Sequence, residues 1–156
     1  MQRRLGDETQ TGSITIIKNY DDPLPEVGCY ASLLNQVFMN LIINAIDAID
    51  RRRKELGEGL RGKIFIKTKL VSKDAILITV EDNGTGMDYK TKAMVFDPLF
   101  TTKPVGKGAG MGLTTSYQIV VENHGGDLSC DSIPGKGTVF NINLLVKMNS
   151  MLPKSG

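Results

Sequence analysis

Residues 35–49 read NQVFMNLIINAIDAI, and this stretch predicts the long central helix of the domain. Apolar residues recur at the three- and four-residue spacing of a helix with one buried stripe: Leu34, Val37, Phe38, Leu41, Ile42, Ala45, Ile46 and Ile49. Asn40 and Asn44 interrupt this run, four residues apart on one helix face. Asparagine is a mediocre helix former, because its side chain competes for backbone hydrogen bonds. Two asparagines beside a core stripe therefore indicate a polar partner.

Composition limits the class of protein. The chain has 156 residues, of which 40% are hydrophobic and 23% charged, which is typical of one compact domain with its own core. A net charge of +2 does not favour nucleic acid or an anionic membrane. No uninterrupted apolar run of membrane-spanning length and no signal-peptide pattern is present. Cys29 and Cys130 form no metal pattern. We therefore expect two reduced thiols in a cytoplasmic domain, whose parent protein is soluble or membrane-anchored.

The order of the predicted elements defines the fold class. Residues 13–147 are expected to form the domain, with a tail or linker end at 1–12 and a C-terminal tail at 148–156. Helices are predicted at 30–54 and 113–124, a helical turn near 89–96, and strands at 13–20, 63–71, 75–82, 125–132 and 137–146. About five strands with helices grouped on one face predict an α+β fold. We expect a two-layer α/β sandwich with a mixed, mostly antiparallel sheet.

A carboxylate ends a predicted inward-facing row of side chains in the strand at 75–82. The alternation of AILITVED places Asp82 on the same face as the apolar residues Ile76, Ile78 and Val80. A buried carboxylate is costly unless hydrogen-bond donors meet it. In the NGTGM that follows, Gly84 and Gly86 leave the backbone open to a flat ligand. The alternative is that Asp82 only caps a turn, since Asp-Asn-Gly is also good turn chemistry.

A second glycine group favours phosphate binding. GKGAGMGL has glycine at alternate positions immediately before a predicted helix: Gly106, Gly108, Gly110 and Gly112. Backbone N–H groups at a helix N-terminus form a site suited to phosphates. Lys103 and Lys107 add positive charge to the same loop. A flexible surface loop is the alternative interpretation.

Two familiar phosphate motifs do not account for these glycines. GEGLRGK at 57–63 has the spacing of a P-loop up to its lysine, but Ile64 follows where a Ser or Thr should bind Mg²⁺. The segment also lies between a helix and a strand, the reverse of the required order. The Rossmann spacing fails because its third glycine position is taken by Met111 or Leu113. A nucleotide site here would be of another kind.

The two asparagines then have a candidate role. Amide oxygens are hard, neutral ligands suited to Mg²⁺, which binds few protein groups and completes its octahedron with phosphates and water. Asn40 and Asn44 could hold the metal over phosphates at the glycine loop, with Asp82 reading the base at the other end. Asparagines that bond only loop backbone are the alternative.

Five motifs, in order, resemble the ATP-binding catalytic domain of bacterial two-component sensor histidine kinases, which has the Bergerat (HATPase) fold. They are NQVFMNLIINAIDAI, EDNGTGM, VFDPLFTTK, GKGAGMGL and GKGTVFNINL, and they cover most of the chain. They resemble, respectively, the asparagine box, the first glycine box, the phenylalanine box, the second glycine box and the terminal strand signature of that family. The variant FDPLFTTKPVGKG is most similar to kinases of the nitrogen-regulatory type.

The resemblance implies roles for individual residues. Asn44 matches the Mg²⁺-binding asparagine, and Asn40 supports the metal or phosphates. Asp82 matches the carboxylate that accepts from the adenine amine, and Thr138 matches a threonine near adenine. Gly84 and Gly86 would let the ring approach.

The resemblance also implies a mobile lid over residues 95–112. Its phosphate-facing end would contain Gly108, Gly110, Gly112 and then Leu113, while Lys103 and Lys107 could reach the phosphates. Phe96 and Phe100 would anchor the lid. No residue is assigned a catalytic role, and Asn40 and Lys107 are the candidates. Asp47 and Ala48 stand where some kinases carry a lysine and an aromatic residue.

Two competing functions share this fold. Gyrase and mismatch-repair ATPases carry a general-base Glu one turn before the metal asparagine, and that position here is Asn40. An amide cannot take a proton, so the position favours a kinase. An anti-sigma serine kinase would differ only in its protein substrate. A nucleotide-sensing module that binds ATP without transfer is the non-enzymatic alternative.

The resemblance implies partners outside this chain. ATP and Mg²⁺ would be the cofactors, and the γ-phosphoryl group would pass to a histidine on a helical dimerisation domain of the parent protein. A response regulator receiver domain would then accept it. The only histidine, His124 in ENHGG, sits where a helix ends, and we expect it to pack or cap there. We expect the isolated domain to be monomeric and to bind no nucleic acid.

Overall fold

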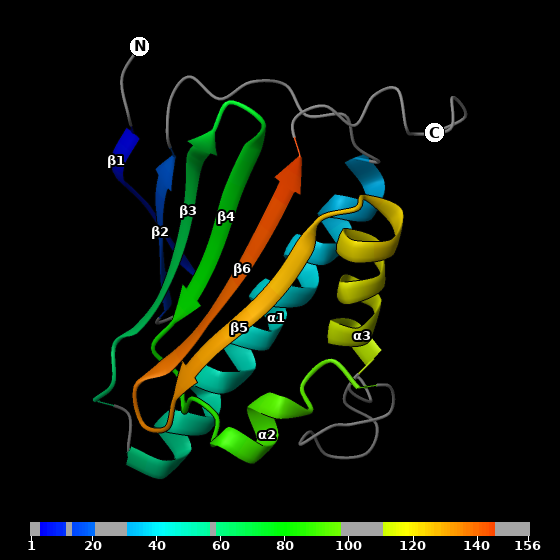
Figure 1. The fold of residues 1–156 in the computed structure, drawn as a ribbon. Coiled ribbons are helices and arrows are strands. Elements are labelled where there is room, and N and C mark those ends of the chain that lie inside the picture. Colours follow the sequence, from blue (N-terminus) through cyan, green and yellow to red (C-terminus); the bar gives the residue numbers. More distant parts are fainter. Residues whose placement is uncertain (1–3, 12–13, 21–30, 57–58, 98–110, 146–156) are drawn as a thin grey trace.

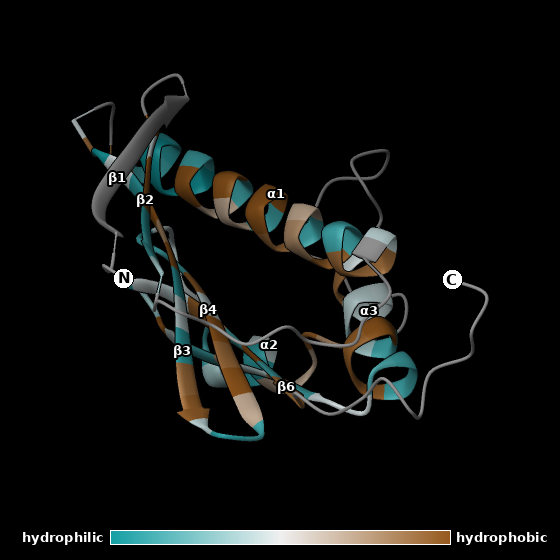
Figure 2. Cartoon of the chain, turned by 90° about the horizontal axis from the view of Figure 1, so that it is seen from above, coloured by the Kyte–Doolittle hydropathy of each residue, from teal (hydrophilic) through white to brown (hydrophobic). Residues whose placement is uncertain are grey.

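The computed structural model describes residues 4–11, 14–20, 31–56, 59–97 and 111–145, and has two layers (Figure 1). One layer is a mixed β-sheet and the other is formed by helices. Figure 2 shows α1 (Ala31–Leu56) and α3 (Met111–Tyr117) on the same side of the sheet. The predicted fold class, a two-layer α+β sandwich, is confirmed.

The sheet has six strands in the order β1-β2-β3-β4-β6-β5. Only β2 and β3 pair in parallel, so the sheet is mixed and mostly antiparallel as predicted. The strands are β1 (Arg4–Thr11), β2 (Ile14–Tyr20), β3 (Gly62–Ser72), β4 (Ala75–Asp82), β5 (Asp127–Ile133) and β6 (Gly137–Leu145).

One strand was not predicted. The segment Arg4–Thr11, expected as part of a tail, is β1 and pairs antiparallel with β2 along the edge of the sheet. Its sequence, RLGDETQT, has no apolar alternation that would mark a strand. The extended conformation of β1 is instead stabilised by backbone hydrogen bonds to the edge of β2. The domain limits of 13–147 otherwise stay a prediction.

The core lies between the sheet and α1. The inner face of β6 contributes Phe140, Ile142 and Leu144, and the buried stripe of α1 packs in the same cluster through Leu34, Val37, Leu41, Ala45 and Ile49. The alternation of buried residues in β4 and β6 follows the pleat, so one face of each strand is apolar. The predicted helix stripe is therefore the principal packing surface of the domain.

The helix α1 is long and apolar enough, from Ser32 to Leu56, to meet a length-and-composition test for a membrane span. The core helix of a soluble protein meets the same test, so the indication is weak. In this structure the apolar stripe of α1 packs against the sheet. Polar residues such as Asn40 and Asn44 interrupt the apolar sequence within this continuous helix.

The predicted helix at 113–124 has two parts. The α-helix α3 is followed by the π-helix η1 (Gln118–Asn123), which local apolar spacing does not distinguish from an α-helix. His124 is the C-cap residue of η1 and is fully buried, with Nδ1 2.8 Å from the carbonyl oxygen of Ile119. Gly125 follows at φ +65° and donates to the carbonyl of Val121. The predicted packing and capping role of His124 is thus confirmed.

Candidate functional site

Three oxygen-bearing side chains lie in one row across neighbouring strands, on the sheet face that α1 covers. Asp82 of β4 is in register with Thr138 of β6, and Thr138 is in register with Ser132 of β5. Asp82 and Thr138 are each 4% exposed, which confirms that both point inward. The row stands at the end of β4, directly before the NGTGM loop.

Asp82 is a buried carboxylate with few compensating donors. Its Oδ1 accepts a hydrogen bond of 2.8 Å from the backbone N–H of Gly84. Burial raises the pKa of Asp82 to about 6, against the lowering effect of hydrogen bonds from the Gly84 and Thr138 backbones. Repulsion by Glu81 and attraction by Arg51 have smaller, opposite effects on this pKa. The fold thus holds a desolvated acceptor in place at a cost in stability.

The raised pKa of Asp82 predicts how stability changes with pH. Because the folded state binds this proton more tightly than the unfolded state, the stabilising contribution is complete below about pH 4 and is lost as the pH rises through about 6. Relative to Asp82→Asn, the free energy of unfolding of the ligand-free wild type should fall by about 2 kcal/mol between pH 4 and pH 7. Denaturant titrations across this range measure the difference. A constant difference between the two proteins would contradict the prediction.

The glycines after Asp82 are required by protein packing. A Cβ at Gly84 would lie 2.6 Å from the backbone carbon of Ala48 in α1, and Thr85 N–H donates to the Ala48 carbonyl at 3.2 Å. Gly86 has φ +70°, and a Cβ there would collide with the carbonyl of Ile133. The small side chain of Ala48 fits this close contact. Access for an adenine ring stays a prediction.

The two asparagines of α1 differ in their surroundings. Asn40 Nδ2 donates to the carbonyl of Gly112 at 3.1 Å and to Ser116 Oγ at 3.3 Å. Because the carbonyl only accepts, the NH₂ group must face α3, so Oδ1 of Asn40 points away from α3 and accepts from no other described residue. The half-buried side chain of Asn44 makes no hydrogen bond to any other described residue. Among the described residues, neither amide oxygen therefore has a hydrogen-bond partner.

Much of the expected lid lies outside the described residues, including Phe100, Lys103, Lys107, Gly108 and Gly110. Two of its predicted residues are described at its C-terminal side. Gly112 lies against Asn40, and a Cβ there would be 3.4 Å from Asn40 Cγ. Leu113 is half-buried and packs partly against the core.

The N-terminal end of the expected lid is held against the core by Phe96. Its ring centroid lies 5.4 Å from that of Tyr117 and 6.3 Å from that of Phe140. Thr114 Oγ1 contacts the carbonyl oxygens of Phe96 at 3.1 Å and Asp97 at 3.2 Å. These contacts join both sides of the expected lid to α3, as expected for an anchoring residue.

Sequence reasoning missed two hydroxyls. Ser116, fully buried in α3, holds the amide of Asn40, and Ser132 contacts Thr138 across the strands. Strand parity offered one signal, because Ser132 continues the inward row of Leu128 and Cys130. Ser116 had no comparable signal, since a single serine in a short helix is unremarkable in sequence.

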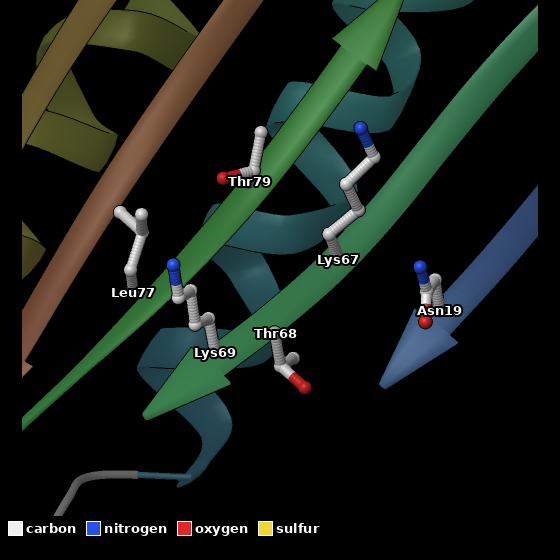
Figure 3. A pocket seen from close by; sticks show the side chains of 6 residues that line it. All are labelled: Asn19, Lys67, Thr68, Lys69, Leu77 and Thr79. Atoms are coloured by element: carbon white, nitrogen blue, oxygen red, sulfur yellow. The ribbon is translucent and has the colours of Figure 1, made fainter. Parts of the chain in front are cut away.

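A shallow groove of about 180 Å³ lies on the sheet face away from α1 (Figure 3). It is lined by Asn19, Lys67, Thr68, Lys69, Leu77 and Thr79. Lys67 is paired with Glu81 at 3.5 Å and lies 5.5 Å from the ring centroid of Phe65. The groove is therefore separate from the row that contains Asp82.

The site residues fit a magnesium nucleotide. A helix rises about 1.5 Å per residue, so Asn44 and Asn40 lie about 6 Å and about 12 Å along α1 from Ala48, where the Asp82 loop docks. A base beside Asp82 would therefore bring its phosphates toward the asparagine end of α1. Two amide oxygens one turn apart suit a cation that also binds phosphates.

Comparison with known proteins identifies the family. A profile of the histidine kinase-, DNA gyrase B- and HSP90-like ATPases matches residues 29–148. This chain belongs to that family. The ATPase family membership agrees with the Bergerat fold and with ATP binding.

Within this ATPase family, similar curated relatives are sensor kinases. Sporulation kinase E of Bacillus subtilis and the signal transduction histidine-protein kinase AtoS of Escherichia coli are each 37% identical over 129 residues, or 83% of this chain. The chain spans only 16% and 19% of their lengths. The predicted resemblance to sensor histidine kinases is confirmed, while the nitrogen-regulatory subtype stays a prediction.

Solved structures of ThkA give the same picture. The catalytic domain of histidine kinase ThkA superposes with a TM-score of 0.70 at 27% identity, covering 86% of this chain and 81% of that domain. A second ThkA structure, in complex with response regulator protein TrrA, has a TM-score of 0.66 at 25% identity and covers 86% of this chain and 34% of that one. The match thus corresponds to the catalytic portion of a histidine kinase.

Proposed function

We propose that this chain is the cytoplasmic catalytic domain of a sensor histidine kinase, which binds ATP with Mg²⁺ and delivers the γ-phosphoryl group to a histidine on a separate dimerisation domain. The observation that carries this proposal is the contact of the loop after Asp82 with Ala48 of α1, one and two helical turns from Asn44 and Asn40. At one end of the proposed nucleotide site, Asp82 is a desolvated acceptor for the adenine amine. At the other end, the amide oxygens of Asn44 and Asn40 would bind the metal.

Residues at each end have distinct proposed roles. Asp82 accepts from the exocyclic amine, with Thr138 beside it. Asn44 and Oδ1 of Asn40 hold Mg²⁺, which would neutralise charge on the phosphates. Lys103, Lys107, Gly108 and Gly110 belong to the proposed phosphate-facing lid, with Gly112 and Leu113 where it joins α3.

Hydrolysis is a poor alternative for this geometry. The position where related ATPases place a general base is Asn40, whose NH₂ group donates to Gly112 and Ser116. An amide committed in this way cannot accept a proton from water. We therefore expect the γ-phosphoryl group to be transferred to a protein acceptor and not to water.

The acceptor is expected outside this chain. His124 is the only histidine in the sequence, is fully buried, and has Nδ1 beside the Ile119 carbonyl. The much longer relatives leave room for a phosphoacceptor domain. The complex of ThkA with TrrA supports a response regulator as the next partner.

Metal dependence tests the proposed phosphate end. Calorimetric titration of wild type with a non-hydrolysable ATP analogue should show tighter binding with Mg²⁺ than without it. Asn44→Ala should remove most of that gain, about tenfold in affinity, because one metal ligand is lost. Asn35→Ala, at an exposed position of the same helix, is the matched control. If Asn44→Ala keeps the full Mg²⁺ effect, Asn44 is not a metal ligand.

Phosphorylation tests the proposed reaction. Incubation of the isolated chain with labelled ATP should give no phosphohistidine, because His124 is buried. Adding the dimerisation domain of the parent protein should give phosphohistidine on that domain alone. Label on His124 of the isolated chain, or no label on the added domain, would overturn the kinase proposal.

A further inference from the structure

Ser132 lies at the centre of a hydrogen-bond network next to the proposed adenine end. Its Oγ is 2.9 Å from Thr138 Oγ1, 2.9 Å from the carbonyl oxygen of Gly137, and 2.7 Å from the backbone nitrogen of Met87. These contacts link β5 to β6 and to the loop after Asp82. No role in ligand binding follows for Ser132 from its sequence position alone.

The number of protons sets the direction of each hydrogen bond. The Gly137 carbonyl can only accept, so the single Ser132 proton is directed to it. Met87 N–H can only donate, so it occupies one lone pair of Ser132 Oγ. The remaining contact is then a hydrogen bond from the Thr138 hydroxyl to Ser132 Oγ. With its proton committed, Thr138 Oγ1 can offer only lone pairs to a ligand.

We propose that Ser132 is a positioning residue that sets Thr138 as a hydrogen-bond acceptor and so makes the base site selective for an amino group over an oxo group. This inference rests on the proposed function, in which Asp82 and Thr138 face the base. Ionised Asp82 is also an acceptor, so the two inward side chains present only lone pairs. The 6-amino group of adenine can donate hydrogen bonds to Asp82 and Thr138. The 6-oxo group of hypoxanthine would instead place another acceptor beside these two acceptors.

The first measurement is the ratio of the dissociation constants of inosine and adenosine 5′-diphosphates, by calorimetry. Wild type should prefer the adenosine nucleotide. In Ser132→Ala the Thr138 hydroxyl can turn and donate, so the ratio should fall on the order of tenfold. Ser129→Ala, which is exposed on the same strand, should leave the ratio unchanged. Ser132→Thr, which keeps the hydroxyl, should restore the wild-type ratio.

A double-mutant cycle separates positioning from general stability. In a Thr138→Val background no hydroxyl remains to be oriented, so Ser132→Ala should no longer change the ratio. A purely structural role would lower both affinities equally and would leave the ratio of wild type intact. If Ser132→Ala does not fold, Ser132→Cys carries the same test, because a thiol is a weak hydrogen-bonding group of similar size.

The outcomes distinguish the two proposals. Wild type that binds adenosine diphosphate, with an unchanged ratio in a folded Ser132→Ala or Ser132→Cys, overturns the positioning role and leaves the proposed function standing. Wild type that binds neither nucleotide overturns both. An equal change of ratio by Ser132→Ala with and without the Thr138 hydroxyl shows that Ser132 does not act through Thr138 and also overturns the inference.

Discussion

Asp82→Ala should abolish measurable binding of adenine nucleotides, weakening affinity by at least about one hundredfold. The carboxylate is the desolvated acceptor at the proposed base end, and it is already aligned by the Gly84 N–H. A ligand donor that meets alanine instead loses a charge-assisted hydrogen bond in a site from which water is largely excluded. Calorimetric titration with ADP, with and without Mg²⁺, measures the loss.

The neighbouring residue on β4 provides the control for Asp82→Ala. Glu81 points to the opposite sheet face, where it pairs with Lys67 at 3.5 Å. Glu81→Ala should therefore bind ADP as wild type does. Thermal unfolding of both variants checks that the loss does not come from misfolding. A folded Asp82→Ala with wild-type affinity would place the base elsewhere.

Gly137→Ala should destabilise the domain by at least about 3 kcal/mol. Gly137 has φ +134°, and an added Cβ would collide with the backbone carbonyl oxygen of Asp82. Neither strand can move away easily, because every residue of β4 is paired with β6, from Ala75 opposite Leu145 to Asp82 opposite Thr138. The collision would also displace Asp82, so nucleotide affinity should fall with stability. Denaturant-induced unfolding measures the first effect and calorimetry the second.

Gly135→Ala is the matched comparison for Gly137→Ala. Gly135 also has positive φ, at +78°, but an added Cβ would meet nothing within 4 Å. Its substitution should cost only backbone strain, about 1 kcal/mol. Equal destabilisation by the two substitutions would show that the collision with the Asp82 carbonyl does not contribute to the loss of stability in Gly137→Ala.

Local patterns predicted much of the fold. The stripe of α1 and the alternation in β4 and β6 depend on neighbouring residues along the chain, so their periods are visible in sequence. Strand β1 has no such pattern and is defined by hydrogen bonds to β2. The π-helical part of 118–123 likewise differs from an α-helix in hydrogen bonding, not in apolar spacing.

The candidate site divides in the same way. Asp82, Asn40 and Asn44 could be selected from sequence, because a polar residue in an apolar row is conspicuous. Ser116 could not, since its partner Asn40 is 76 residues away in the chain. Strand parity places Ser132 on the inward face, but it does not show the contact of Ser132 with Thr138. Gly84 and Gly86 were expected to admit a ring, which stays a prediction; the tertiary structure adds that a side chain at either position would collide with Ala48 or Ile133.

The sequence by itself therefore determined the family, the strand parity that buries Asp82, and the helix face that carries Asn40 and Asn44. Only the tertiary structure decided that Asn40 directs its NH₂ group to α3 and that Ser132 Oγ accepts a hydrogen bond from the Thr138 hydroxyl. The physical reason is that hydrogen-bond direction depends on which donors and acceptors meet in space. The spacing of residues along a chain does not specify those meetings across separate elements.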